Sequence, residues 1–310
     1  MDLLIRRSTL ILPVNIPRFV EKAHLRGADA VMLDLEDAVP PAEKHTARQR
    51  VREGLALVGR GGAEVFVRVN NDPALLTADL EASVHPGLQG ICFPKTESAA
   101  QVAALDAGIA DLERSRGLPS GRVEIALLIE SPVGTVNLEA IAAASPRIKT
   151  ISLGPEDYWL ELGVEPSLEG TELLYALSKV VTVSRAFRIH PLGLLGSIGN
   201  FRDLQAFERA ATRARELGCV GASCIHPDQV AVLHRVFSPA PERVAPARRV
   251  VEAFEEGLRR GTASVNVDGA MVDPPVYRRA RRILDHALAL AEVERRKADA
   301  LARNIHAEPS

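Results

Sequence analysis

Side chains suited to acid–base or metal chemistry recur in this sequence at one end of a series of short apolar runs. Most of these runs end at a charged residue, and one ends at a histidine. If the runs are parallel strands of a barrel, their carboxyl ends meet at one mouth, where barrel enzymes place their active sites. The segments concerned are Asp34–Asp37, Arg68–Asn70, Pro94–Lys95, Glu130–Pro132, Gly154–Asp157 and His226–Pro227.

Two of these carboxylates, Glu130 and Asp157, have the residue type and placement expected of metal ligands. Glu130 closes the apolar run Ile125–Ile129, where an ionised carboxylate is costly to bury without a partner. Asp157 comes one predicted strand later. Two carboxylates on adjacent strand ends leave positions for water and a bidentate substrate, as in a typical Mg²⁺ site. Taken alone, either residue could instead be a helix N-cap or part of a surface ion pair. The presence of both together favours the metal-ligand interpretation.

Arg68 and the acids around it have two interpretations. The planar fork of Arg68 suits bidentate recognition of a substrate carboxylate, and a structural bridge to Glu36 or Asp37 is an equal alternative. Strand alternation places Asp34 and Glu36 on one face, from which they can bind water on the metal or pair with Arg68 and Lys95. A charged loop that caps the next helix is the other possibility. We expect Lys95 to be ion-paired rather than a Schiff-base lysine, which needs a lowered pKa.

His226 and the serine residues are weaker candidates for chemistry. A single histidine before a proline is more typical of a shape and hydrogen-bonding element than of a base. No serine lies in a nucleophile elbow, so an acyl-enzyme mechanism is not expected.

Eight predicted strands with helices between most of them would position these residues, and this order predicts a (β/α)₈ TIM barrel. Near-continuous apolar strands are typical of a parallel sheet buried on both faces. No glycine-rich fingerprint follows the first strand, which argues against a dinucleotide-binding fold. Helices are predicted at Ile16–Arg26, Ala42–Val58, Ser98–Ser115, Thr135–Ala144, Thr171–Phe187 and Phe201–Glu216, with a short, weak one between Val69 and Gly90. The predicted strands are Thr9–Pro13, Ala30–Leu35, Glu64–Val69, Gly90–Pro94, Glu124–Ile129, Thr150–Leu153, Ile189–Leu194 and Val220–Ile225.

After the eighth strand the pattern changes. We expect residues 1–237 to form the barrel and residues 238–310 to form a C-terminal helical extension, beginning at the turn-rich segment Ser238–Pro241. Two helices are predicted there, Ala245–Arg260 and Pro275–Ala298, followed by a frayed tail from Asn304. Because the barrel is already complete, this hairpin must pack outside it or on a neighbouring subunit.

Composition narrows the class of protein. The chain is 46% hydrophobic and 25% charged, with a formal net charge of -2 and no block of basic residues. These values favour a globular enzyme and argue against nucleic acid or an acidic membrane as a partner. No apolar run approaches the roughly 20 residues of a membrane helix. The three cysteines lack metal-type spacing and predict a reducing, cytoplasmic location, with Cys92 and Cys224 as buried thiols.

Taken together, these segments resemble the citrate lyase β-subunit-like (CitE-like) CoA-ester lyases of the HpcH/HpaI aldolase/citrate lyase superfamily. The resemblance covers about Arg7 to Ala289. The combination of DLEDAV, the later PEDYWLELG and IHPDQ is specific in this order. The matching segments are RSTLILPVN, GADAVMLDLEDAVPPAEK, VRVN, GICFPKTES, LLIESPVG, LGPEDYWLELG, IHPDQV and DGAMVDPPVYRRARRIL.

The resemblance implies a Mg²⁺-dependent lyase that cleaves or forms a 3-hydroxyacyl-CoA, such as malyl-, citramalyl- or citryl-CoA. The products are an acyl-CoA and a 2-oxo acid, and the assembly is a homotrimer or homohexamer. Glu130 and Asp157 are then the metal ligands, and Arg68 binds the oxo-acid carboxylate.

The resemblance also assigns residues to the coenzyme and to proton transfer. It places the main chain of Ile225 and His226 beside the thioester, and Arg18 and Lys22 at the phosphates of CoA. It further implies that Asp273 enters a neighbouring subunit's site as the acid/base.

Two departures from the family pattern keep other functions open. Val14 stands where a glycine is usual, and a valine cannot replace a glycine that needs a positive φ. The strand-seven segment HPLGLLGSIGNFRD lacks the usual acidic residue. One alternative is a metal-dependent aldolase acting on free 2-oxo acids without CoA, although Asp37 occupies the place of a histidine common in those relatives. The other is a non-catalytic barrel that binds a metal-chelated metabolite.

Overall fold

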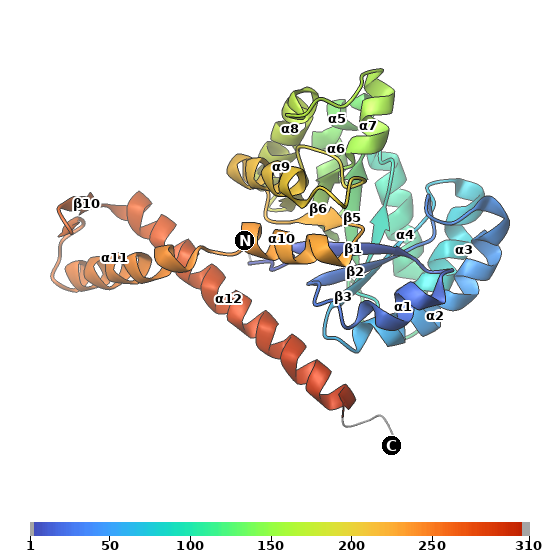
Figure 1. Cartoon of the computed structure of the whole chain (residues 1–310), viewed down its shortest axis with the longest axis horizontal. Helices are drawn as coiled ribbons and strands as arrows, with labels where there is room; N and C mark the ends of the chain where they lie inside the picture. The colour runs from blue at the N-terminus through green and yellow to red at the C-terminus, as the bar shows by residue number, and fades with distance from the viewer. Residues whose placement is uncertain (1–2, 306–310) are drawn as a thin grey trace. The chain divides into compact units, whose positions relative to one another are not determined.

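The computed structural model describes residues 3–305, most of which build an eight-stranded parallel barrel (Figure 1). Neighbouring strands follow chain order from β1 to β7, and β8 pairs with β1. Between β7 and β8, Val220 N–H donates to the Pro191 carbonyl and Gly193 N–H to the Gly221 carbonyl, both at 3.0 Å. These bonds complete the ring, so the predicted TIM-barrel fold is confirmed. The strands are β1 Ser8–Pro13, β2 Ala30–Asp34, β3 Glu64–Arg68, β4 Gly90–Phe93, β5 Glu124–Ile129, β6 Ile148–Leu153, β7 His190–Leu192 and β8 Ala222–Cys224.

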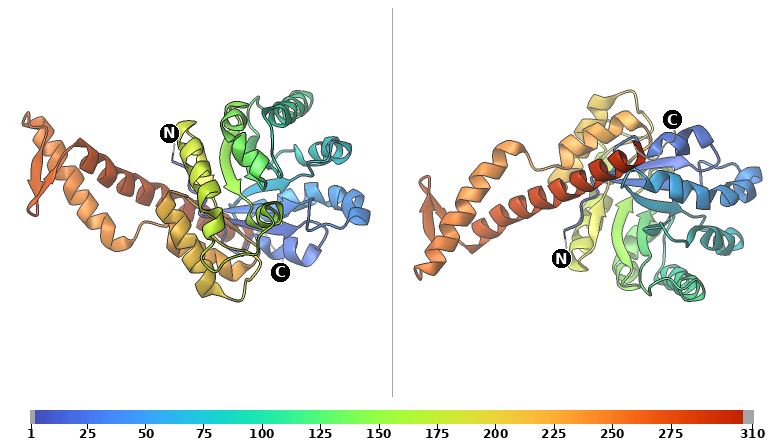
Figure 2. Two further views of the ribbon diagram at one scale, coloured as in Figure 1. Left: turned by 90° about the horizontal axis from the view of Figure 1, so that it is seen from above. Right: turned by 90° about the horizontal axis from the view of Figure 1, so that it is seen from below.

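Every predicted barrel strand overlaps an observed one, and Glu124–Ile129 matches exactly. The helices between the strands lie around the outside of the sheet (Figure 2). The main core fills the layer between strands and helices, with residues such as Leu33, Ile91 and Ile125 fully buried. The helices of this layer are α1 Pro17–Ala23, α2 Lys44–Gly59, α3 Pro73–Ser83, α4 Ala99–Ser115, α5 Pro132–Val136, α6 Leu138–Ala143, α7 Pro155–Leu162, α8 Leu174–Ala186, α9 Leu204–Leu217 and α10 Pro227–Phe237, with 3₁₀ turns η1 Pro41–Glu43 and η2 Thr171–Leu173.

The helices differ from the prediction in four places. Helices α7 and α10 were not predicted, because each starts at a proline just after a strand, in a segment taken for a turn. Helix α3 is regular rather than weak, since Asp72 caps it by accepting a hydrogen bond from Ala74 N at 2.9 Å. The helix predicted at Thr135–Ala144 is broken at Asn137, whose Nδ2 donates to the Glu97 carbonyl at 2.9 Å.

The amino-terminal end of the barrel is closed by Arg6. Its guanidinium forms ion pairs with Glu64 at 2.7 Å and Glu124 at 3.0 Å, and lies 4.4 Å from the Phe66 ring centroid. Arg6 is only 2% exposed, so the lumen ends in a dense plug at this side. As expected, the cysteines of β4 and β8 are buried, and burial raises the pKa of both thiols.

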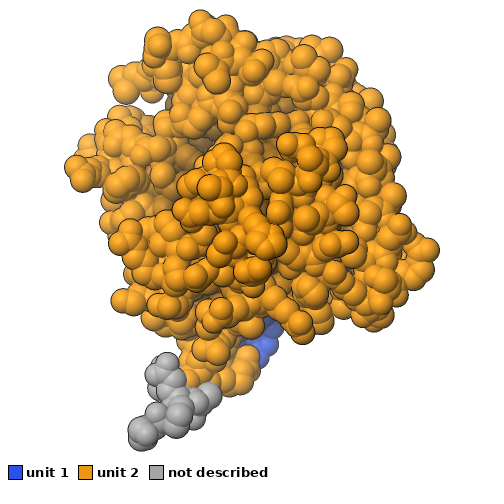
Figure 3. Space-filling view, turned by 90° about the vertical axis from the view of Figure 1, so that its right-hand side faces the viewer, with its two compact units in different colours: residues 1–5, 238–296 blue, residues 6–237, 297–310 orange. Residues whose placement is uncertain are grey.

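The chain divides into two compact units, coloured separately in Figure 3. The barrel unit comprises residues 6–237 and 297–310, and the helical unit comprises residues 1–5 and 238–296. The helical unit contains α11 Pro241–Arg259 and most of α12 Pro274–Ile305, joined by an antiparallel hairpin that was not predicted, β9 Val265–Val267 and β10 Ala270–Val272. Packing of this unit on a neighbouring subunit stays a prediction.

The two predicted C-terminal helices are confirmed, but the second is longer than expected. Helix α12 continues to Ile305, and Asn304 Nδ2 donates to the Arg60 carbonyl at 2.7 Å. The frayed tail predicted from Asn304 is therefore wrong at its first two residues, and the rest lies outside the described residues. No helix within residues 3–305 is both long and apolar enough to span a membrane.

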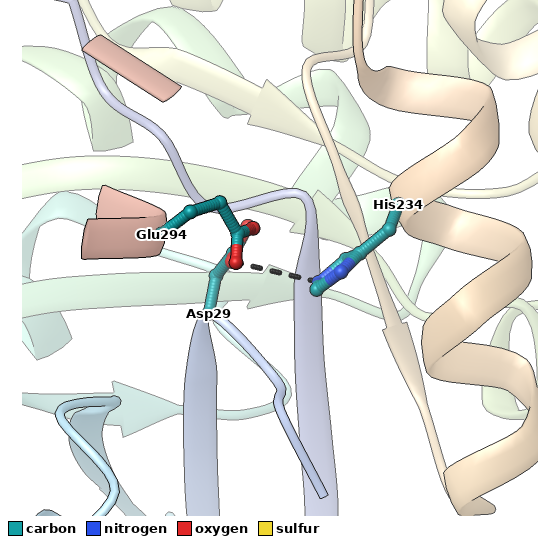
Figure 4. Close-up of side chains that lie close together, drawn as sticks. All are labelled: Asp29, His234 and Glu294. Carbon is teal, nitrogen blue, oxygen red and sulfur yellow. Dashed lines mark ion pairs between the residues drawn. The ribbon is translucent and has the colours of Figure 1, made fainter. Parts of the chain in front are cut away.

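A buried ionic cluster around Asp29 joins the barrel strands to the last turns of α12. Asp29 precedes β2 and accepts hydrogen bonds from Arg7 Nε at 2.8 Å and from Lys297 Nζ at 2.9 Å. His234 Nε2 lies 3.5 Å from Asp29 Oδ1, the pair marked in Figure 4. Burial alone raises the pKa of Asp29, but the hydrogen bond from Arg7 and the nearby positive charges outweigh it and lower the pKa to about 2.

Replacing Asp29 by Asn is expected to destabilise the barrel by about 3 kcal/mol at neutral pH, because Arg7 and Lys297 lose their buried counter-charge. Urea unfolding followed by circular dichroism measures this difference. Because the folded pKa lies below the unfolded value, this stabilisation is complete above pH 5 and is lost as the pH falls toward 2.

Asp111→Asn is the matched control, because its ion pair with Arg114 is on the surface. It should change the free energy of unfolding by less than about 0.5 kcal/mol. Equal losses in the two variants at pH 7 would contradict the role given to the Asp29 cluster.

Candidate active site at the barrel mouth

A cavity of about 220 Å³ opens at the carboxyl ends of the strands and brings together four of the predicted side chains. These are Arg68 of β3, Asp157 of α7, and Asp37 and Glu130 from the loops that follow β2 and β5. The parallel barrel explains the convergence, since it collects every strand's carboxyl end at one mouth. The rest of the lining is mainly Ile11, Leu128, Ser152, Leu153, Gly154, Pro155, Glu156, Gly193, Leu194, Ile198 and Ser223.

Glu130 follows β5 directly and is only 5% exposed. Its Oε2 accepts a hydrogen bond from Lys95 N at 2.8 Å, whereas no group within residues 3–305 donates a hydrogen bond to Oε1. Burial, reinforced by the nearby charges of Glu36 and Asp157, raises the pKa of Glu130 to about 8. A buried carboxylate with one unpaired oxygen at a cavity is suited to a cation that displaces its proton.

The sequence predicted Asp157 at a strand end. It lies instead in the first turn of α7. It is half-buried and lines the same cavity as Glu130. Neither carboxylate forms an ion pair with any cation in the described part of the chain. Two hard oxygen donors that form no ion pair with the described residues fit Mg²⁺, which takes few carboxylates and keeps several ligand positions for water and substrate.

Lys95 orients Glu130 through its backbone rather than through its charge. Its φ is 49°, a left-handed conformation that is uncommon outside glycine and that accompanies the hydrogen bond from its N–H to Glu130. Asn71 Nδ2 holds this turn by donating to the Pro94 and Lys95 carbonyls at 3.0 and 2.7 Å. Sequence reasoning missed Asn71, although it directly follows the VRVN segment.

The side chain of Lys95 is ion-paired, as predicted. Its Nζ lies 2.6 Å from Glu36 Oε1 and 3.1 Å from Asp37 Oδ1. Burial lowers the pKa of Lys95, but the bond to Glu36 and the charges of both acids outweigh this effect and raise it. A lysine with a raised pKa is unsuited to Schiff-base formation.

Arg68 is held in a fixed orientation by two acids. Its Nε and Nη2 donate to the two oxygens of Asp34 at 2.7 Å each, and Nη1 lies 3.1 Å from Glu36 Oε2. Burial lowers the pKa of Arg68, and the hydrogen bonds to Asp34 more than compensate and raise it. The expected pairing of Asp34 and Glu36 with Arg68 is therefore present. Three of the five N–H groups of a guanidinium face these acids, which leaves two for the cavity that Arg68 lines.

Ile225 and His226 form a turn after β8 that is held by a buried glutamine. Gln229 Oε1 accepts hydrogen bonds from Ile225 N at 2.9 Å and His226 N at 3.1 Å, and its Nε2 donates to the Ile198 carbonyl at 3.1 Å. The His226 ring stacks on Phe201 at 4.9 Å between centroids. These contacts suit a shape element, and contact of this turn with a thioester stays a prediction. Gln229 was missed as an individual residue, although IHPDQ contains it.

Comparison with known proteins agrees with this arrangement. The family model described as HpcH/HpaI aldolase/citrate lyase matches residues 7–227. The chain belongs to this family. It is 36% identical to the citrate lyase subunit beta of Leuconostoc mesenteroides subsp. cremoris, over 92% of this chain and 94% of that one. It is 33% identical to an L-malyl-CoA/beta-methylmalyl-CoA lyase of Cereibacter sphaeroides, over 91% and 94% of the two chains.

A solved structure of similar fold is the CitE protein of Mycobacterium tuberculosis in complex with magnesium, acetoacetate and coenzyme A. The TM-score is 0.70 at 29% sequence identity, covering 90% of this chain and 97% of that one. The expected family membership is therefore confirmed along almost the whole chain.

Five residues implied by membership of the HpcH/HpaI family are not among those that line the mouth cavity, namely Ile225, His226, Arg18, Lys22 and Asp273. Arg18 and Lys22 are exposed on α1, four positions apart and so on one helix face. Asp273 belongs to the helical unit and caps α12, with its Oδ1 accepting a hydrogen bond from Val276 N at 3.0 Å. The roles of Arg18, Lys22 and Asp273 stay predictions, as does that of the turn at Ile225 and His226.

Val14 does not disturb the turn after β1. It is 2% exposed, and it is absent from the non-glycine residues with positive φ in the described chain, which are Lys95, Arg188 and Asp268. The backbone conformation at this position therefore does not require a glycine.

Gly154 is required by the position of Glu130. A Cβ at residue 154 would lie 2.6 Å from Glu130 Cγ and 2.7 Å from its Oε1, closer than van der Waals contact allows. We expect Gly154→Ala to displace the carboxylate and to weaken Mg²⁺ binding by about 10- to 100-fold, measured by calorimetry.

Gly59→Ala provides the control for this substitution. Its added Cβ would meet nothing closer than Val65 Cγ2 at 3.8 Å. Unchanged Mg²⁺ affinity in the Gly154 variant would show that Glu130 is not a ligand.

Proposed function

We propose that this chain is a Mg²⁺-dependent carbon–carbon lyase that cleaves or forms a 3-hydroxyacyl-CoA such as malyl-, citramalyl- or citryl-CoA. Its products are an acyl-CoA and a 2-oxo acid. The observation that carries the proposal is the pair Glu130 and Asp157, which lie in one cavity with Arg68 and form no ion pair among residues 3–305. Relatives named as citrate lyase subunit beta and as L-malyl-CoA/beta-methylmalyl-CoA lyase, and a related structure holding magnesium and coenzyme A, support it.

In this proposal the residues of the mouth bind and orient the oxo-acid part of the substrate. Glu130 and Asp157 hold the cation, which when bound supplies positive charge beside the oxo or hydroxyl oxygen. Asp34 and Glu36 already orient the Arg68 guanidinium, and its remaining N–H groups donate to the substrate carboxylate. This preorganisation lowers the entropy cost of holding the carbonyl carbon beside the thioester enolate.

The coenzyme is proposed to approach from the mouth side, because Arg6 and its partners close the opposite end of the lumen. Arg18 and Lys22, exposed on α1, are proposed to pair with CoA phosphates, and the turn at Ile225 and His226 is proposed to lie beside the thioester. The assembly is proposed to be a homotrimer or homohexamer, and the cytoplasmic location predicted from the cysteines stays a prediction.

The direct test incubates purified protein with malyl-, citramalyl- and citryl-CoA and follows release of the 2-oxo acid. With Mg²⁺ we expect turnover of at least one thioester, abolished by EDTA and reduced at least about 10³-fold in Glu130→Gln. Glu161→Gln, exposed on α7, is the control and should keep full activity. Intact thioesters across the panel would refute the proposal, and turnover of free 2-oxo acids instead would favour the aldolase alternative.

Asp273 is proposed to act as acid/base at the thioester α-carbon of a neighbouring subunit. Asn keeps the N-cap of α12, so Asp273→Asn removes the acid without removing the cap. We expect Asp273→Asn and Glu130→Gln to be inactive separately, and co-refolded mixtures of the two to regain activity. Mixtures that stay inactive while forming mixed oligomers would place Asp273 at the site of its own chain or outside catalysis.

A further inference from the structure

The floor of the mouth cavity is formed by inward-facing residues of four strands. Ile11, Leu128, Ser152 and Ser223 come from β1, β5, β6 and β8, and all four line both this cavity and a smaller one of about 30 Å³ below it. Each is partly exposed, although its two neighbours along the strand are buried. Because successive strand residues alternate between faces, these side chains point into the lumen.

The two serine hydroxyls of the floor have no hydrogen-bond partner within residues 3–305. Buried hydroxyls at the ends of other strands do have one: Ser131 Oγ donates to Glu97 at 2.6 Å, and Thr96 Oγ1 to the Phe93 carbonyl at 3.0 Å. Polar groups withdrawn from bulk water are normally hydrogen-bonded. The floor hydroxyls are therefore available to a molecule in the cavity.

The direction of the substrate follows from the shape of the barrel, and this step rests on the proposed function. Glu130, Asp157 and Arg68 hold the carboxylate and oxo oxygen at the mouth. Coenzyme A is too large for the lumen, which Arg6 closes at the base, so the thioester approaches from the open side. The remaining substituent on the carbonyl carbon of the 2-oxo acid then points down to the floor.

We propose that Ser152 and Ser223 determine which 2-oxo acid is used, by hydrogen bonding to a polar group on that substituent. Hydrogen bonds to an ionised acceptor are stronger than those to a neutral one, so the two hydroxyls favour a carboxylate there. Ile11 and Leu128 cover the rest of the floor and limit the length of the substituent. The site therefore selects a short dicarboxylic 2-oxo acid over an aliphatic one of similar size.

The test compares binding of oxaloacetate and 2-oxobutyrate, which differ chiefly by a carboxylate in place of a methyl group. Calorimetry with Mg²⁺ present gives both dissociation constants without requiring turnover. We expect the wild type to prefer oxaloacetate and the variant Ser152→Ala/Ser223→Ala to lose roughly 10-fold in oxaloacetate affinity per hydroxyl. Its 2-oxobutyrate affinity should change by less than about threefold, since that ligand makes no such bonds.

The ratio of the two affinities separates selectivity from general damage to the site. Ser115→Ala, at the exposed end of α4, should leave the ratio unchanged. An unchanged ratio in the double variant, or a wild type that prefers 2-oxobutyrate, overturns the assignment of Ser152 and Ser223 while the proposed lyase stands. Failure of the wild type to bind any 2-oxo acid with Mg²⁺ refutes the proposed function and this inference together.

Discussion

The mouth of this barrel is organised by a shortage of positive charge. Arg68 and Lys95, two cations at the mouth, form ion pairs with Asp34, Glu36 and Asp37. Glu130 and Asp157 remain without an ion-pair partner among residues 3–305. A buried carboxylate in this position is stable only if it binds a proton or a cation. The pKa of Glu130, which burial raises to about 8, corresponds to binding of a proton. A divalent cation bound between Glu130 and Asp157 would take the place of that proton.

The backbone around Glu130 is built for this one carboxylate. Lys95 adopts a left-handed conformation and donates its N–H to Oε2, while Gly154 leaves the space that Oε1 and Cγ occupy. A side chain at residue 154 or a relaxed turn at residue 95 would move the carboxylate. Because Asn71 ties down the turn from the preceding loop, the orientation of Glu130 depends on three strand ends together.

The barrel and much of its mouth could be predicted because both follow from local rules. Buried parallel strands are continuous apolar runs, and their polar ends identified Arg68, Lys95 and Glu130 from the sequence. Asp157 was identified as a residue but assigned to a strand end, since Gly154–Pro155 has the appearance of a turn and α7 is only eight residues long. Asn71 and Gln229 act through side-chain bonds to distant main-chain groups, and no local pattern encodes such bonds.

The pairing of Arg68 with Asp34 shows why its two sequence interpretations are not exclusive. A free arginine side chain loses rotamer entropy when it binds a carboxylate, and here Asp34 has already fixed the guanidinium plane through two bonds of 2.7 Å. Asp34 leaves other N–H groups of the Arg68 guanidinium unused. Because these groups lie in the same fixed plane, they are already oriented for a second carboxylate. The acid that neutralises Arg68 thus also orients it. Net positive charge for an anionic substrate must then come from the cation held by Glu130 and Asp157, which couples substrate binding to metal binding.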